Sequence, residues 1–94
     1  MYRLLVSNSA KRSIKKLPIP VRHALFEETT VLEQNPYVGE KLSGSLSFLY
    51  SFHFFVKGIT YRAVYTVDEE KKEITFHLAG IRDNFYEKVR RLFR

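Results

Sequence analysis

The stretch FLYSFHFFVKGITYRAVYTVDEEKKEITFHLAGIRDNFY, residues 48–86, decides the fold because large apolar side chains recur in it at every second position. The pattern is clearest in residues 48–56 and returns in residues 60–67 and 73–79. Alternation with a period of two predicts β-strands that have one buried face and one open face. We therefore predict three antiparallel strands, followed by the start of a helix. The open face collects two histidines and an arginine.

The dipeptide Lys57-Gly58 predicts how the first two strands pair. Glycine tolerates the positive φ angle that a two-residue hairpin turn requires. With this turn, His53 lies opposite Arg62 on the neighbouring strand, about 5 Å away between Cβ atoms. A four-residue loop in the charged run 68–72 would place His77 on the other side of Arg62, although this second register depends on the length of that loop.

The residues before this stretch predict one more strand and two helices. Residues 2–6 alternate like a strand, and a serine or asparagine within residues 7–9 can cap a helix that ends at Pro18. Pro20 suits the first turn of a second helix, which stops before Asn35-Pro36. Two short helices joined by a proline-rich turn form a hairpin whose apolar side must lie against the sheet.

The chain ends with a helix that starts at about Asp83, after Gly80 interrupts the third strand of the hairpin region. Residues 35–47 contain mainly turn-forming residues and predict a loop. The expected fold is therefore α+β: an N-terminal strand and a two-helix hairpin packed on an antiparallel sheet of about four strands, with a C-terminal helix. We expect residues 1–94 to form one domain.

Composition narrows the classes of function. A net charge of +6 favours a polyanion or an acidic protein as partner, with solubility as the ordinary alternative explanation. The absence of cysteine removes disulfides and thiolate metal ligands and suits a reducing compartment. The three histidines lack clustered carboxylates, so we expect neither a metal nor a cofactor. No run of residues predicts a membrane span or signal peptide, and the cytoplasm is the expected location.

Four side chains near the open face suggest chemistry on a phosphate. A positive neighbour such as Arg62 favours the neutral form of His53, which can then act as a general base. Arg62 itself can bind a phosphate through two hydrogen bonds. Arg82 follows the third strand, and Tyr86 lies four residues further along the chain. Such a set fits RNA cleavage by its own 2′-hydroxyl, and the alternative is an ordinary solvated sheet face.

Three blocks carry a resemblance to a known family: KLSGSLSFLYSFHF at residues 41–54, YRAVYTVDEEKKEI at 61–74 and AGIRDNFY at 79–86. Their order and spacing resemble the RelE/ParE superfamily of bacterial toxins over essentially the whole chain. The resemblance implies either a ribosome-dependent endoribonuclease that cuts mRNA or a ParE-like poison of DNA gyrase. It also implies a cognate antitoxin protein as partner, with a toxin–antitoxin hetero-oligomer as the complex. A catalytically inactive family member that only binds an antitoxin is the third alternative.

The resemblance also implies roles for individual residues. Arg62 matches the arginine that contacts the scissile phosphate, Arg82 matches a second catalytic arginine, and Tyr86 lies close to the C-terminal tyrosine of the family. Well-known RelE members have two lysines where this chain has Ser51 and His53, which leaves His53 as the expected base. The retained arginines and tyrosine favour the nuclease over the gyrase poison. The expected RNA contacts are Lys41, Ser51, Lys57, His77, Lys88, Arg90 and Arg91.

Overall fold

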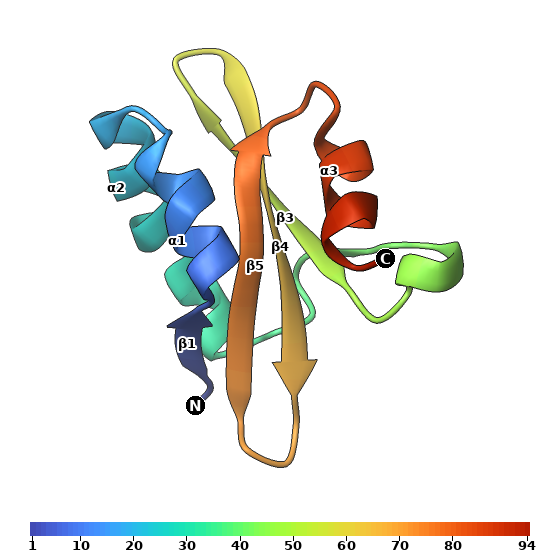
Figure 1. The fold of residues 1–94 in the computed structure, drawn as a ribbon. Helices are drawn as coiled ribbons and strands as arrows, with labels where there is room; N and C mark the ends of the chain where they lie inside the picture. Colours follow the sequence, from blue (N-terminus) through green and yellow to red (C-terminus); the bar gives the residue numbers. More distant parts are fainter.

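The computed structural model describes residues 1–94 and contains a five-stranded sheet with helices on both faces (Figure 1). In space the strands follow the order β1-β5-β4-β3-β2. β1 runs parallel to β5, and every other neighbouring pair is antiparallel. The α+β class is confirmed. The strands are β1 (Arg3–Val6), β2 (Glu40–Lys41), β3 (Tyr50–Val56), β4 (Ile59–Asp68) and β5 (Glu73–Ile81).

The sheet has five strands rather than about four because part of the expected loop at residues 35–47 joins it. The backbone of residues 40 and 41 pairs with Ser51 and Tyr50 at the edge of β3 and forms the short strand β2. A two-residue strand has no alternating pattern, so the sequence does not distinguish it from loop. This edge strand fixes residues 40 and 41 beside β3.

The helices form where capping and proline residues predicted them. The Ser7 hydroxyl accepts a hydrogen bond from the Ala10 N–H at 3.1 Å and caps the first helix. Pro18 precedes the second, which continues into a short 3-10 turn. None of the helices is long and apolar enough to cross a membrane. The helical elements are α1 (Asn8–Lys15), α2 (Ile19–Glu28), η1 (Thr29–Glu33), η2 (Gly44–Leu46) and α3 (Phe85–Leu92).

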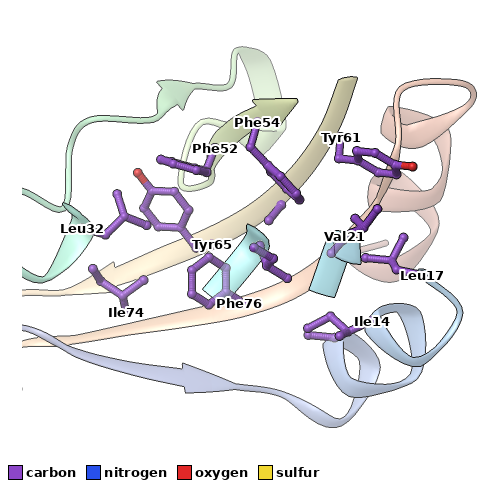
Figure 2. Packing of buried hydrophobic residues seen from close by; sticks show 14 residues of the cluster. Ile14, Leu17, Val21, Leu32, Phe52, Phe54, Tyr61, Tyr65, Ile74 and Phe76 are labelled. Carbon is purple, nitrogen blue, oxygen red and sulfur yellow. The ribbon is translucent and has the colours of Figure 1, made fainter. Parts of the chain in front are cut away.

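The main core lies between the sheet and the α1–α2 hairpin, as predicted (Figure 2). Aromatic rings from one face of β3, β4 and β5 pack against aliphatic side chains of the two helices. Tyr65, near the middle of β4, has no exposed surface. Burying these large apolar side chains is the principal stabilising term for so small a chain. The residues of this core that Figure 2 labels are Ile14, Leu17, Val21, Leu32, Phe52, Phe54, Tyr61, Tyr65, Ile74 and Phe76.

The pairing of β3 with β4 agrees with the prediction from the turn. Lys57 and Gly58 both have positive φ angles, 51° and 81°, as a two-residue hairpin turn of this kind requires. Val56 therefore pairs with Ile59, and His53 pairs with Arg62.

The predicted row His53, Arg62, His77 is wrong at its third member. Arg62 lies opposite Gly80 because the four-residue β4–β5 loop spans residues 69–72, which pairs Asp68 with Glu73, and because the register shifts again at a bulge between Val64 and Tyr65. Beyond the bulge Leu78 faces α3, while Ala79 returns to the main core. The bulge thus supplies apolar residues to both faces of the sheet. Gly80 also does not end the strand, which continues to Ile81.

The second face of the sheet is not as open as the alternation suggested, because α3 packs across it. Phe85 and Val89 of this helix are buried against Leu49 and Val64 of the sheet side. Part of this face is therefore a second, smaller core.

The buried hydroxyl of Tyr65 ties the loop before β2 to the main core. It donates a hydrogen bond to the Pro36 carbonyl oxygen at 2.7 Å and accepts one from the Gly39 N–H at 3.0 Å. Burial raises the pKa of Tyr65 to about 12. A Cβ atom on Gly39 would lie 2.5 Å from the Tyr65 hydroxyl oxygen and 2.9 Å from the Ser51 carbonyl oxygen. Only glycine fits at this position without displacement of its neighbours.

Replacing Gly39 with alanine should therefore destabilise the protein by about 1–3 kcal/mol, the usual cost of overpacking. Tyr65→Phe should cost about 1–3 kcal/mol by leaving the Pro36 carbonyl and the Gly39 N–H without partners. The double variant should cost less than the sum, because phenylalanine removes one of the two clashing oxygens. Chemical denaturation of the four proteins measures these values, and strict additivity would contradict the contact.

Candidate active site

The site is centred on a contact between Arg62 of β4 and Tyr86 of α3. An Nη1 hydrogen of Arg62 is donated to the Tyr86 hydroxyl oxygen at 2.6 Å. The guanidinium carbon also lies 5.3 Å from the centre of the Tyr86 ring, within the range of a cation–π contact. Buried Phe85 and Val89, on either side of Tyr86 in sequence, hold the helix on the sheet. The tyrosine is therefore positioned by packing as well as by the arginine.

Arg62 and Tyr86 line a groove of about 440 Å³ between α3 and the segment that follows Gly39. Arg90, one helical turn after Tyr86, lines the same side. The opposite wall comes from β2 and η2, and most charged groups in the groove are cationic. Such a groove suits a phosphate chain. Its lining residues are Glu40, Lys41, Leu42, Ser43, Gly44, Ser45, Leu46, Arg62, Tyr86 and Arg90.

His53 lies beside Arg62, as predicted, but it does not line this groove. Burial, and then the positive charge of Arg62, lower the pKa of His53, while Glu40 acts in the opposite direction. The imidazole is therefore neutral at neutral pH. It lines a smaller groove of about 220 Å³ at the β2–β3 edge, together with Glu40 and Ser51.

Three buried polar atoms on this face have no hydrogen-bond partner within the protein. They are Ser51 Oγ, His53 Nε2 and Arg62 Nε. Pairing of β3 with β4 places all three side chains close together on the face that α3 partly covers. Most buried polar atoms in folded proteins are hydrogen-bonded, so the cluster distinguishes this strip from the rest of the fold.

Arg82 is not brought to the Arg62–Tyr86 pair. It is exposed in the short loop after β5 and lines a separate groove with Gly58, Ile59 and Thr60, next to the β3–β4 turn. Lys57 is exposed at the same turn. These two cations therefore lie at one end of the sheet.

The remaining predicted contacts differ in accessibility. Lys41 lines the main groove, and its ammonium group bonds to the Ser47 carbonyl oxygen and lies 5.0 Å from the centre of the Tyr50 ring. Ser51 is only 1% exposed. His77 bonds to Thr66 Oγ1 at 2.9 Å and lies against Phe93, away from the main groove. Exposed cations continue along α3: Lys88, and then Arg90 and Arg91, which line a second groove together.

Glu40 is the site residue that the sequence analysis missed. It lines both the main groove and the smaller groove of His53. The sequence contains little indication of Glu40, because this residue lies in a segment predicted as a loop, where apolar and polar residues do not alternate. Its only indication was its position next to Lys41, which the resemblance had already suggested as an RNA contact.

Comparison with known proteins agrees with this architecture. The sequence model of a family described as the ParE-like toxin of type II bacterial toxin–antitoxin systems matches residues 4–90. No curated protein matches the chain significantly.

Several solved structures are similar. A chain of the RelBE2 toxin–antitoxin complex of Mycobacterium tuberculosis is 26% identical, with a TM-score of 0.73 over 86% of this chain and 98% of that one. A chain of the intact Escherichia coli RelBE complex is 23% identical, with a TM-score of 0.72 over 88% and 99%. The free E. coli toxin RelE, in a form with two arginines replaced by alanine, is 22% identical, with a TM-score of 0.75 over 96% of both chains.

The two half-buried histidines predict how stability depends on pH. Burial lowers the pKa of His77, and burial with Arg62 lowers that of His53. The folded pKa values thus lie below the unfolded value of about 6.5, so the unfolded chain takes up protons first as pH falls. The free energy of unfolding should be constant between about pH 7.5 and 9 and should decrease as pH falls through 6.5 towards the folded pKa values.

Denaturation at a series of pH values tests this, with His53→Gln and His77→Gln each expected to reduce the slope below pH 6.5. His23→Gln, at an exposed site on α2, is the matched control. A stability that rises on acidification over this range would contradict the assignment.

Proposed function

The chain belongs to the ParE-like toxins of type II bacterial toxin–antitoxin systems, and within this family we propose that it is an endoribonuclease that cuts mRNA on the ribosome. The observation that carries the proposal is the Arg62–Tyr86 hydrogen bond in a mainly cationic groove. A toxin that acts only by binding its target needs no such pairing of a phosphate-binding cation with a proton donor. We take residues 1–94 as one toxin domain.

The proposed reaction is attack of a ribose 2′-hydroxyl on the adjacent phosphorus. Arg62 stabilises the negative charge that develops on the phosphate oxygens. Tyr86 already accepts a hydrogen bond from Arg62, so its own proton remains available for the departing 5′-oxygen. The tyrosinate that results lies beside the guanidinium group. Arg82, exposed at the end of β5, is proposed to contact the phosphate chain once RNA is bound.

The proton acceptor predicted from the sequence, His53, fits the geometry of the groove less well than Arg62 and Tyr86. The lowered pKa of His53 suits a base. Its Nε2 atom, however, is covered by protein, and the ring lies outside the groove of Arg62 and Tyr86. These two features argue against direct contact between His53 and the 2′-hydroxyl.

The distribution of charge supports the ribosome as the place of cleavage. The net charge is +6, and exposed cations on α1 and α3 add positive surface on both faces of the sheet. Such surfaces bind the phosphate backbone of ribosomal RNA without reading its sequence. Ribosome-bound mRNA is a cytoplasmic target, so we propose the cytoplasm as the site of action.

The partner that controls a type II toxin is its antitoxin. Two of the similar solved structures are toxin–antitoxin complexes. For this chain we propose a cognate antitoxin with an acidic segment that is disordered when free and folds on the basic toxin. The resulting hetero-oligomer would neutralise the toxin.

A second candidate function is inhibition of DNA gyrase. Two observations favour it: the matching family is described as ParE-like, and Arg82 lies apart from Arg62 and Tyr86. Under this alternative the groove residues are ordinary surface residues and the chain performs no chemistry.

Induced expression in bacteria separates the two candidates. With labelled methionine and labelled thymidine followed in parallel, the nuclease should stop methionine incorporation first and spare DNA synthesis. Early loss of thymidine incorporation would instead assign the protein to the gyrase inhibitors. Continued incorporation of both labels would leave only the antitoxin-binding role.

Substitutions at the central pair test the chemistry. Arg62→Ala should lower cleavage of mRNA on programmed ribosomes by about 100- to 1,000-fold, through loss of charge stabilisation. Tyr86→Phe should lower it by about 100- to 10,000-fold, through loss of the proton donor. Lys71→Ala, which removes an exposed cation at the β4–β5 turn, is the control and should cleave normally. Undiminished cleavage by folded Arg62→Ala would refute the proposed site.

A further inference from the structure

The groove of Arg62 and Tyr86 contains one carboxylate. Among its lining residues the charged side chains are Lys41, Arg62, Arg90 and Glu40, of which only Glu40 is negative. A negative charge opposes the binding of a phosphate chain, so this residue weakens the interaction for which the rest of the groove is suited. The presence of Glu40 in the groove therefore indicates a role other than increasing the affinity for a phosphate chain.

The strand register places Glu40 on the same face of the sheet as Arg62. Glu40 pairs with Ser51, and Ser51 pairs with Val64 on β4. Residues two apart on a strand share a face, so Arg62 lies on the Val64 side, which is the side that α3 covers. Glu40 is two strands away from Arg62, about 10 Å across the sheet. The two side chains therefore project into the groove from opposite walls.

Accessibility separates Glu40 from His53 as proton acceptors. Glu40 is exposed and lines the same groove as Arg62 and Tyr86. His53 lines only the neighbouring small groove, and its Nε2 atom is covered. A group must come within hydrogen-bond reach of the proton that it removes. By this criterion the carboxylate is better placed than the imidazole.

We propose that Glu40 is the general base of the cleavage reaction, an inference that rests on the proposed nuclease function. The Glu40 carboxylate takes the proton of the 2′-hydroxyl, and the 2′-oxygen forms a bond to phosphorus. The bond from phosphorus to the 5′-oxygen breaks, and Tyr86 gives its proton to that oxygen. The products are a 2′,3′-cyclic phosphate and a 5′-hydroxyl. Proton exchange with solvent returns Glu40 and Tyr86 to their starting states.

Positive side chains surround Glu40 in the groove. Cations face the groove from three elements, namely Lys41 on β2, Arg62 on β4 and Arg90 on α3. His53 lies on β3, between the strands of Glu40 and Arg62, and shares the small groove with Glu40. We infer that His53 is a positioning residue, which limits the freedom of the carboxylate without touching the substrate.

The substitution Glu40→Gln tests the proposal, because it keeps the size of the side chain and removes its charge. On programmed ribosomes the maximal cleavage rate should fall by about 100- to 10,000-fold while binding is kept or tightened. The maximal cleavage rate should fall less in His53→Gln than in Glu40→Gln. Glu87→Gln, which removes an exposed carboxylate next to Tyr86 but outside the groove, is the matched control and should cleave like the unmodified protein.

A cleavage rate that does not fall in Glu40→Gln would identify Glu40 as a surface charge only. If Glu40 only repels the phosphate chain, Glu40→Gln will bind mRNA more tightly and cleave it at least as fast, which overturns the proposal. A greater loss in His53→Gln than in Glu40→Gln also overturns it. Failure of the unmodified protein to cleave ribosome-bound mRNA would refute the nuclease function itself, and the base with it.

A substrate with a sulfur leaving atom distinguishes the residue that removes the 2′-hydroxyl proton from the residue that protonates the leaving group. Replacing the bridging 5′-oxygen with sulfur creates a leaving group that needs no protonation, so Tyr86→Phe should recover most of its lost rate. Glu40→Gln should remain slow, because the 2′-hydroxyl still requires a base. Recovery of Glu40→Gln on this substrate would show that Glu40 acts at the leaving group and would overturn its assignment as base.

Discussion

The pairing of β3 with β4 is the constraint on which the rest of the structure depends. The turn at Lys57-Gly58 sets this register, and the register decides which side chains enter the main core. A slip by one residue would turn the aromatic residues of β3 away from α1 and α2. It would also separate Arg62 from His53, which lie opposite each other across these two strands. A single local turn therefore determines both which side chains enter the main core and which residue lies beside the central cation.

The fold covers both faces of its sheet, and this has consequences for Arg62. An arginine in a central strand requires partners for its donors, because burial of an unpaired charge is costly. The position opposite Arg62 is Gly80, which has no side chain, and Phe85 packs above that glycine. The close approach brings α3, and with it Tyr86, to the guanidinium group. The partner of the cation is thus supplied by packing of the second core.

Sequence reasoning succeeded where the structure is determined locally. The Lys57-Gly58 turn and the break at Pro18 depend on neighbouring residues, and both were predicted. The helix cap was narrowed to residues 7–9, of which Ser7 forms it. The bulge beside Tyr65 was not predicted, because it depends on how apolar side chains pack into two cores at once. The position of Glu40 was missed for a similar reason. Its strand is defined only by pairing with β3 and has no pattern of its own.

The wall that carries Glu40 is held by a residue on the opposite face of the sheet. Tyr65 belongs to the main core, yet its hydroxyl binds Pro36 and Gly39, and Gly39 directly precedes Glu40. The ordering of this segment is therefore achieved during folding and need not be supplied when a ligand binds. Arg82 differs, because it lies in an exposed loop with no comparable anchor. Two parts of the site, the Glu40 wall and the Arg62–Tyr86 pair, are thus preorganised by packing and hydrogen bonds, whereas Arg82 is not.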